Sequence, residues 1–314
     1  MKAAVVIEAG KPPLYTDFKE PAPGPGEVLV TVSAAALSPL AKARASGAHY
    51  SSDAEVPFAA GVDGVGRLAD GRRVYFVLPR APFGSMAERS VVDAALCVPL
   101  PAGLDEVQAA AIANPGMSSW AALKERARLV VGETVLVNGA TGASGQLAVR
   151  IARLLGARKV IAAGRNRALL DALPADAHIP LVDDGQALET AFKAQFAQGI
   201  DVVLDYLWGP SAERLLVAAA KAAPEGHRIR YVQIGNASAP TISLPGAALR
   251  AGGLELMGSG IGSVPVPRLL KAIGELFQAA AAGSLEIAAK SLPLAEVGKT
   301  WAGDADGRIV FTLA

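Results

Sequence analysis

The segment VLVNGATGASGQLAVRIARLLGA, residues 135–157, constrains the fold of this chain more than any other. Its three glycines, Gly139, Gly142 and Gly145, stand three residues apart between an apolar run and a helical repeat of leucine and isoleucine. Such a turn can hold a pyrophosphate, or it can be a glycine-rich connection without a ligand. The strand before it, the helix after it and a further strand beyond favour the nucleotide-binding alternative.

Each glycine of this loop would have its own role. The first would end the strand in a tight turn, the second would let the backbone approach a pyrophosphate, and the third would let the helix pack closely. The start of the helix would offer free N–H groups and a positive dipole end to the phosphates. The hydroxyl groups of Thr141 and Ser144 could also donate hydrogen bonds to the phosphates. The predicted cofactor-binding residues of the loop are Gly139, Thr141, Gly142, Ala143, Ser144 and Gly145.

The second strand of this region predicts which dinucleotide binds. Sites that select NAD place an acid about 20 residues past the glycines, where it binds the ribose 2′-hydroxyl. Here the sequence is AAGRNRA, so that Gly164 takes the place of the acid and Arg165 and Arg167 follow. Guanidinium groups suit a 2′-phosphate, and we predict NADPH. The alternative is two solvated arginines at a helix start, where their charge opposes the helix dipole and calls for a compensating anion.

The spacing of apolar residues divides the rest of the chain into two parts. Short apolar runs cut by proline and glycine fill the first third, including residues 27–38 and 72–78, and predict a mostly β domain. From residue 134 onward, strand-like runs alternate with helical patterns, which predicts an α/β domain with a parallel sheet and helices on both faces. The final run RIVFTL reads as a strand that could rejoin the first domain.

Composition excludes several classes of protein. The chain has 314 residues, is 52% hydrophobic and carries a net charge of +1, so nothing indicates a nucleic-acid partner. No apolar run is long enough to span a membrane, and the first residues read as a strand rather than a signal peptide. The single cysteine, Cys97, precludes an intrachain disulfide and reads as a packing residue. We expect a cytoplasmic protein.

Taken together, several motifs make the chain resemble the medium-chain dehydrogenase/reductase superfamily, in its zinc-free quinone oxidoreductase branch. Besides the glycine loop, they are PGPGEVLVTVSAAALSP, AAGVDGVG, GRRVYF, FGSMAERSVV, DVVLDYLWG and GLELMGS. The resemblance implies a GroES-like catalytic domain of residues 1–117 and 258–314, and a Rossmann domain, a doubly wound parallel sheet, of residues 118–257. It implies a reaction cleft where the domains meet. It also implies a homodimer joined through the edge strand from Gly253 to Ser259.

A second resemblance, to atypical short-chain reductases, rests on GATGASG alone. Those proteins begin with the nucleotide-binding strand, whereas here a whole β domain precedes it, so we set this alternative aside.

The zinc-dependent branch holds its metal with cysteine and histidine, and this chain lacks them at the matching places. Ser38 or its neighbour Leu37 stands for the first ligand, Asp63 stands for the second, and NPGMSSW has no cysteine for the third. The three histidines, His49, His178 and His227, share no ligand spacing. We expect no metal site, and we expect Asp63 to structure a glycine-rich turn.

The resemblance also suggests catalytic candidates. Tyr50 lies in the loop that carries a tyrosine near the nicotinamide in the family, as proton donor or carbonyl clamp, and His49 is the second choice; a surface aromatic is the alternative. Ser38 takes the place of a common asparagine. Asn114 either faces the nicotinamide or caps a helix that starts near Met117.

Further cofactor contacts are expected at the carboxyl ends of the strands of the second domain, where ligands of such sheets bind. Tyr206, Gly235 and Asn236 stand at these ends. For Asp205, the alternative to a cofactor contact is an internal polar anchor. We predict a zinc-independent, NADPH-dependent reductase of a small quinone or enone. A 2-enoyl thioester reductase and a non-enzymatic NADPH-binding protein of the same fold remain as alternatives.

Overall fold

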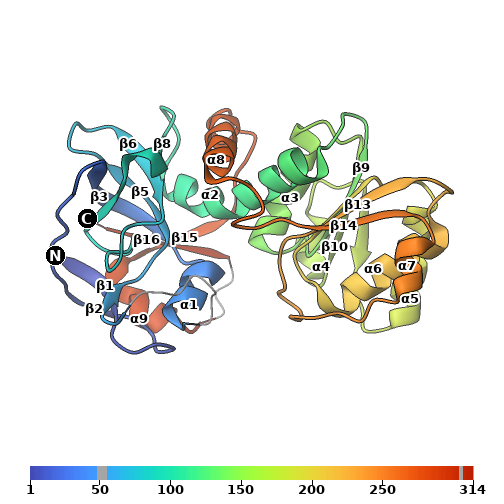
Figure 1. Ribbon diagram of the computed structural model, residues 1–314, viewed down its shortest axis with the longest axis horizontal. Coiled ribbons are helices and arrows are strands. Elements are labelled where there is room, and N and C mark those ends of the chain that lie inside the picture. Colours follow the sequence, from blue (N-terminus) through green and yellow to red (C-terminus); the bar gives the residue numbers. More distant parts are fainter. Residues whose placement is uncertain (48–54, 304–306, 314) are drawn as a thin grey trace. The chain divides into compact units, whose positions relative to one another are not determined.

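The computed structural model describes residues 1–47, 55–303 and 307–313. The chain forms two compact units, Met1–Asn114 with Ile273–Ala314, and Pro115–Ala272. Both ends of the chain belong to the first unit, where Figure 1 shows the red strands β15 and β16 among blue ones. The second unit is a continuous segment inserted between them.

The first unit is built on two sheets of short strands. The smaller sheet has the order β2-β1-β4, and the larger one has the order β15-β16-β3-β5-β6-β8, with β7 also paired to β3. The strands of this unit are β1 (Lys2–Val6), β2 (Leu14–Asp17), β3 (Glu27–Ala36), β4 (Phe58–Ala59), β5 (Asp63–Arg67), β6 (Arg73–Val77), β7 (Arg89–Asp93), β8 (Cys97–Pro99), β15 (Ala289–Pro293) and β16 (Arg308–Thr312). Its short helices are α1 (Pro39–Ala45), η1 (Ala94–Leu96), η3 (Leu294–Glu296) and α9 (Val297–Thr300).

The predicted return of the last strand to the first sheet is confirmed. Strand β16 pairs antiparallel with β3, so that Val310 lies opposite Ala36 and Phe311 opposite Ala35. Phe311 is fully buried in a core that it shares with Val6 and Trp301. Burial of these apolar side chains from both ends of the chain holds the first unit together across the inserted segment.

The second unit contains one six-stranded sheet of the order β11-β10-β9-β12-β13-β14. All of its strand pairs are parallel. In chain order this is the doubly wound arrangement 3-2-1-4-5-6, with a topological switch point between β9 and β12. The strands are β9 (Thr134–Asn138), β10 (Lys159–Gly164), β11 (Ala177–Pro180), β12 (Val202–Asp205), β13 (Arg228–Gln233) and β14 (Gly253–Gly258).

Helices cover this sheet as the alternating pattern predicts. They are α3 (Ala143–Leu154), α4 (Arg167–Asp171), α5 (Gly185–Phe196), α6 (Gly209–Ala222) and α7 (Gly246–Arg250). Phe192 of α5 and Leu215 of α6 pack with Leu136 of β9 in one core cluster, while α3 contacts β9 and β10. All five residues of β9 are buried, because a central parallel strand is covered on both faces.

The chain passes between the units inside two helices, α2 (Glu106–Ala121) and α8 (Val266–Ala281). A π-helical turn, Ala122–Ala127, follows α2. The expected capping of a helix near Met117 by Asn114 is wrong, because α2 begins at Glu106 and Asn114 lies inside it. The second crossing follows Ala272, and Val264 and Leu269 pack against Ala121 of the second unit.

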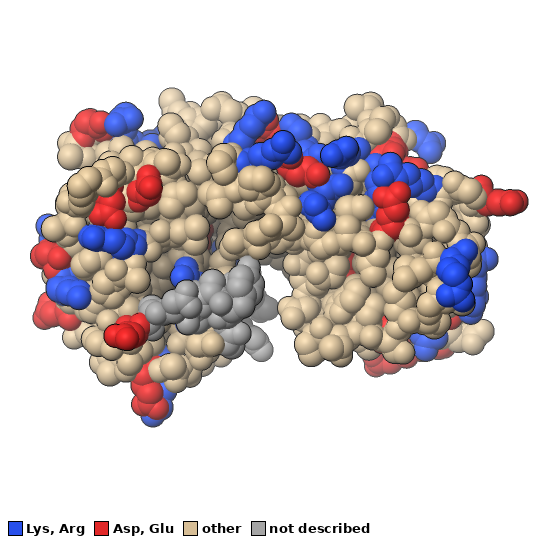
Figure 2. Space-filling model, viewed as in Figure 1, with Lys and Arg blue, Asp and Glu red and all other residues tan. Residues whose placement is uncertain are grey.

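Basic and acidic side chains are interspersed over the face shown in Figure 2. Among the described residues, no helix combines the length and the apolar character needed to cross a membrane.

The close approach of β3 and β5 depends on one glycine. A Cβ at Gly66 would lie 2.2 Å from the carbonyl oxygen of Thr31, so Gly66→Ala must push the two strands apart. We expect it to lower the free energy of unfolding in urea by about 1–3 kcal/mol. Gly252→Ala is the matched control, because nothing lies within 4 Å of its Cβ. Equal stability of the two variants would contradict this account of the sheet.

Candidate functional site

The glycine loop lies where the sequence predicts it, between β9 and α3. Gly139 has φ +91°, and its N–H, like that of Ala140, donates to the carbonyl of Ala163 at the end of β10, at 2.9 and 2.8 Å. Helix α3 begins directly after Gly142, which as a glycine has no side chain to cap the first turn. Its first N–H groups are therefore available to an anion, which is the property of a phosphate-binding helix start.

One of the loop glycines, Gly145, is required by close packing. A Cβ at Gly145 would lie 2.2 Å from the carbonyl oxygen of Gly139 and 2.6 Å from the Cα of Ala140. The helix therefore approaches the loop as closely as predicted for this position. At Gly142, by contrast, only one atom lies within 4 Å, at 3.6 Å. This exposed glycine leaves open space over the loop, as backbone approach by a pyrophosphate would need.

The end of β10 explains why no acid follows the loop. A Cβ at Gly164 would lie 2.6 Å from Cγ2 and 3.1 Å from Oγ1 of Thr141. A larger side chain at Gly164 would therefore need the side chain of Thr141 to move. In the structure, Thr141 occupies part of the space that the acid of an NAD site would use.

The two arginines after Gly164 differ in their partners. Arg167 pairs with Asp171, with 2.7 Å between Nε and Oδ2, and Asn166 caps the helix by accepting from the N–H of Leu169 at 3.1 Å. Asp171 is thus the anion expected to compensate a cation at this helix start. Arg165 is exposed and has no ion pair with any residue that the structure describes. Its guanidinium is available to a ligand.

A buried carboxylate organises the neighbouring strand ends. Asp205 at the end of β12 is fully buried, and it accepts hydrogen bonds from Asn138 Nδ2 at the end of β9 and from the Tyr231 hydroxyl of β13, both at 2.8 Å. The backbone N–H groups of Leu207 and Trp208 also donate to it, at 2.9 and 3.2 Å. Burial raises the pKa of Asp205, while these donors lower it. The expected role of an internal polar anchor is confirmed by these contacts.

Tyr206, a predicted cofactor contact, uses its hydroxyl inside the protein. Its oxygen lies 2.7 Å from Ser119 Oγ of α2, and that hydroxyl is also 3.2 Å from the carbonyl of Ser144 in the first turn of α3. Burial raises the pKa of Tyr206, so the phenol stays protonated. Tyr206 therefore joins β12 to the helix of the glycine loop. The sequence does not predict the role of Ser119, because no pattern marks a buried serine as a partner of a distant tyrosine.

The turn after β12 fits between two glycines. A Cβ at Gly139 would lie 3.0 Å from Leu207 Cγ, and one at Gly235 would lie 2.7 Å from the carbonyl oxygen of Tyr206. The N–H of Gly235 donates to the carbonyl of Asp205 at 3.1 Å. Gly235 is therefore required by packing, and Asn236 beside it is exposed. The fold brings both residues to the same strand ends as the glycine loop.

Two predicted catalytic residues belong to the first unit. Ser38 caps α1, since its buried hydroxyl accepts from the N–H of Ala41 at 3.0 Å. Asn114 lies half-buried within α2. Tyr50 and His49 fall outside the described residues. The structure thus gives Ser38 a helix-capping role and leaves its catalytic role a prediction.

Asp63 does not structure a turn as expected, because it begins β5. Its buried Oδ2 accepts from the Tyr75 hydroxyl at 2.9 Å, and burial raises its pKa against the opposing charge of Arg308. Arg308, in the last strand, donates to the carbonyl of Leu37 at 3.1 Å. The position expected to match a zinc ligand of the zinc-dependent branch therefore contributes to the packing of the first unit.

The histidines and the cysteine in the described part of the chain have backbone or packing roles. His178 Nε2 lies 3.1 Å from the carbonyl of Leu173, and His227 Nε2 lies 3.0 Å from that of Ile200. Burial raises the pKa of Cys97 to about 11, so it is a thiol near neutral pH. Among the described residues, no three histidine, cysteine or acidic side chains form a group that could hold a metal ion.

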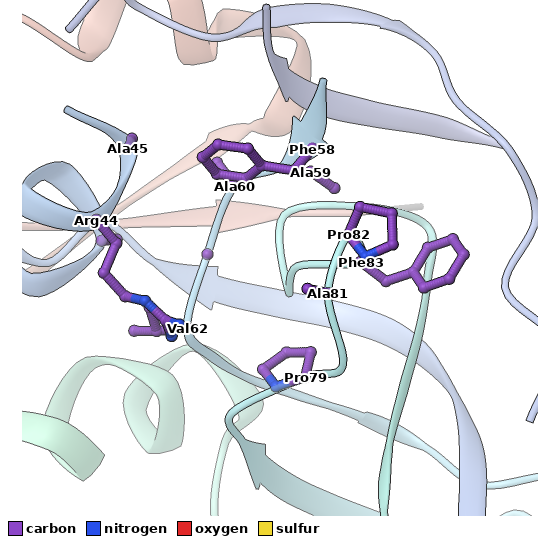
Figure 3. Close-up of a pocket in the computed structure, with 12 residues that line it drawn as sticks. Arg44, Ala45, Phe58, Ala59, Ala60, Val62, Pro79, Ala81, Pro82 and Phe83 are labelled. Carbon is purple, nitrogen blue, oxygen red and sulfur yellow. The ribbon is translucent and has the colours of Figure 1, made fainter. Parts of the chain in front are cut away.

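In the described part of the chain, each unit contains a pocket. In the first unit, Arg44, Phe58 and Phe83 line a pocket of about 50 Å³ (Figure 3), which has room for a few water molecules. In the second unit, a hollow of about 310 Å³ is lined by Trp208, Gln233, Asn236, Pro240, Leu256, Met257 and Gly258. Only the hollow reaches the size typical of small-molecule sites, roughly 300–1,000 Å³.

Comparison with known proteins identifies the family. No family model matches the chain. A probable NADPH-dependent quinone reductase of Emericella nidulans is 30% identical to it, over 96% of this chain and 96% of that protein. The chain belongs to the medium-chain dehydrogenase/reductase superfamily, in its quinone oxidoreductase branch. This confirms the resemblance read from the motifs.

Solved structures agree with the fold. The quinone oxidoreductase of Thermus thermophilus, solved alone and with NADPH, is 29% identical with a TM-score of 0.77, over the full length of both chains. A mycobacterial quinone oxidoreductase superimposes with a TM-score of 0.85 at 22% identity, again over both full chains. The two-domain α/β fold predicted from the sequence is therefore confirmed.

The link between Tyr206 and Ser119 can be measured with a double-mutant cycle. We expect Tyr206→Phe and Ser119→Ala each to lower the free energy of unfolding by about 1 kcal/mol. Because both changes remove the same hydrogen bond, the double variant should lose less than the sum of the two. Additive losses would show that the two hydroxyls do not interact.

Proposed function

We propose that this protein is a zinc-independent, NADPH-dependent reductase that transfers hydride to a quinone or an α,β-unsaturated carbonyl compound. The observation that carries the proposal is the pair Gly164 and Arg165 beside the glycine loop. The first position lacks the acid of an NAD site, and the second offers a guanidinium with no partner among the described residues. The names of the relatives, which include NADPH-dependent quinone reductase, support the same reading.

The residues present fit the dinucleotide. The uncapped start of α3 and the open space at Gly142 suit a pyrophosphate, and Arg165 suits a 2′-phosphate. When bound, NADPH supplies the hydride. The loop and its helix hold the phosphates and fix the cofactor in position, while Gly235 and Asn236 stand at strand ends that suit its nicotinamide half.

The proton that completes the reduction needs a donor from the chain. Tyr50 is the first candidate and His49 the second, and Ser38 and Asn114 are candidates for polar contacts with the reacting groups. General-acid groups of this kind contribute roughly 10²–10⁴-fold to a rate. Measuring kcat for Tyr50→Phe and His49→Gln tests the assignment, and unchanged values for both variants would remove both candidates.

A substrate panel tests the proposed reaction. We expect NADPH to be oxidised in the presence of quinones or enones and without added zinc. The oxidation is measured as the loss of absorbance of the reduced nicotinamide. Crotonyl thioesters belong to the same panel, because turnover with them alone would identify a 2-enoyl thioester reductase. Tight NADPH binding without turnover of any compound would instead favour a non-enzymatic protein.

The cofactor preference can be tested at Arg165. We expect Arg165→Ala to weaken NADPH binding by about 10- to 100-fold, because a charge-assisted hydrogen bond contributes roughly 1.5–3 kcal/mol, and to leave NADH binding nearly unchanged. Arg214→Ala is the matched control, since that guanidinium lies in α6 and is paired with Glu189, whereas Arg167→Ala tests the second predicted arginine. Equal losses of NADPH and NADH affinity in Arg165→Ala would contradict the assignment.

We further propose a cytoplasmic homodimer joined through the edge strand Gly253–Ser259. Strand β14 lies at the end of the sheet order and its outer edge has no neighbouring strand among the described residues. Such an edge presents unpaired N–H and C=O groups, with which a strand of a second chain can pair. Sedimentation should give twice the chain mass of 32.0 kDa, and a single-chain mass at micromolar concentration would contradict this.

A further inference from the structure

Val131 is an apolar residue at the tip of an exposed turn, where polar residues and glycine are usual. Residues 130–133 form a β-turn, in which the N–H of Glu133 donates to the carbonyl of Val130 at 3.2 Å. Gly132, with φ +94°, supplies the left-handed position that a type II turn needs. Val130 is 60% exposed and Val131 is 79% exposed. Two neighbouring valines therefore face solvent at this turn, residues 130–133, which we call the valine turn.

Contacts on both sides fix the valine turn. The N–H of Val130 donates to Glu133 Oε2 at 2.8 Å, and the N–H of Gly132 donates to the carbonyl of Gly156 at 2.8 Å. A Cβ at Gly156 would lie 2.9 Å from Val131 Cγ2, so the turn packs against the segment that follows α3. The exposed valines are thus a preformed feature of the surface.

Two arginines without a carboxylate partner flank the valine turn. Arg158 is exposed, and its Nε donates to the carbonyl of Gly132 at 3.2 Å. Arg128 is also exposed and lies two residues before Val130. Within the described chain, neither arginine forms an ion pair, and the guanidinium of Arg128 has no hydrogen-bond partner either. Both positive charges are therefore available to an anionic partner.

The carboxylates close to the valine turn are used by other groups. Glu133, within the turn, forms an ion pair with the buried Arg230. Arg153 donates to the carbonyl of Arg158 at 3.0 Å and pairs with Asp176. The surface around the exposed valines thus keeps an excess of positive charge, although the net charge of the whole chain is only +1.

This surface lies away from the cofactor site. Gly132 and Arg158 stand just before β9 and β10, so they lie at the amino ends of these parallel strands. Ligands of doubly wound sheets bind at the carboxyl ends. In the sheet order, β12 and β13 separate β9 from the edge strand β14. The valine turn therefore belongs neither to the proposed cofactor site nor to the proposed dimer edge.

An anionic membrane surface is the partner that fits these features best. Apolar side chains at a tip, with basic groups beside them, are the combination by which peripheral proteins bind such surfaces. A stable protein–protein interface buries about 800 Å² on each partner, which far exceeds what two valine side chains offer. A membrane needs no matching surface of that size, because a protruding tip can enter the layer of lipid headgroups.

We propose that the valine turn, together with Arg128 and Arg158, is a docking site for the surface of a membrane that contains anionic phospholipids. The valines enter the headgroup layer, and the guanidinium groups bind lipid phosphates. The association involves one face of the membrane only. It does not depend on the proposed function, because no group of the cofactor site takes part.

Co-sedimentation with vesicles tests the inference. The full-length protein is mixed with vesicles of phosphatidylcholine alone, or of equal parts of phosphatidylcholine and phosphatidylglycerol. We expect binding to the anionic vesicles, little binding to the neutral ones, and weaker binding at high salt, because salt screens exposed charges. Val131→Asp should weaken binding about tenfold or more, because it brings a carboxylate into the headgroup layer. Arg128→Gln and Arg158→Gln should each weaken it about fivefold.

Matched control variants lie elsewhere on the chain. Val182→Asp makes the same change at another exposed valine, which stands beside Asp183 and Asp184. Arg72→Gln removes an exposed arginine of the first unit. Both controls should bind anionic vesicles nearly as the wild-type protein does. If the unfolding curve shows that Val131→Asp does not fold, Val131→Ser takes its place.

Three outcomes would overturn the inference. No binding of the wild-type protein to anionic vesicles would exclude the membrane as a partner. Equal binding of the wild-type protein and Val131→Asp would place the contact elsewhere on the protein. Binding to heparin that depends on Arg128 and Arg158, without binding to vesicles, would indicate an acidic macromolecule instead. NADPH oxidation in solution should be equal in the wild-type protein and Val131→Asp, so failure of the proposed function would leave this test unaffected.

Discussion

The buried carboxylate of Asp205 is the interaction on which the second unit depends. It accepts hydrogen bonds from side chains at the ends of β9 and β13 and from the backbone of its own turn. A carboxylate that is buried away from water needs such hydrogen-bond donors. Here they come from β9, from β13 and from the turn that follows β12. The carboxylate therefore fixes the carboxyl ends of β9, β12 and β13 relative to one another, at the edge where ligands of this kind of sheet bind.

The glycines of the site allow close packing around that turn. Gly139 and Gly235 lie against Leu207 and Tyr206, and Gly145 lies against Gly139. Tyr206 in turn reaches Ser119 and, through it, the first turn of α3. Side chains at these glycines would separate elements whose spacing sets the shape of the phosphate loop. Trp208 of the same turn lines the hollow, so this turn packs against the glycine loop and also forms part of the hollow.

The sequence predicted the elements of the site better than their partners. The loop, its helix, the arginines and the alternation of strands and helices all follow from local patterns, since period and glycine spacing are properties of consecutive residues. The capping of a helix at Asn114 was wrong because α2 continues through Pro115, with no break visible in the apolar pattern. Ser119, Trp208 and Leu256 were missed because each acts through residues that lie far away along the chain.

The sequence by itself determined the family, the doubly wound sheet and the pair Gly164 and Arg165, since motif order and local spacing suffice for these. Only the tertiary structure decided which polar groups already have a partner within the protein. Arg167 is occupied by Asp171, the Tyr206 hydroxyl by Ser119, and Ser38 by its own helix. The tertiary structure also decided that Trp208 lies near the edge strand. Strands β12 and β14 both pair with β13, although the three segments are far apart along the chain.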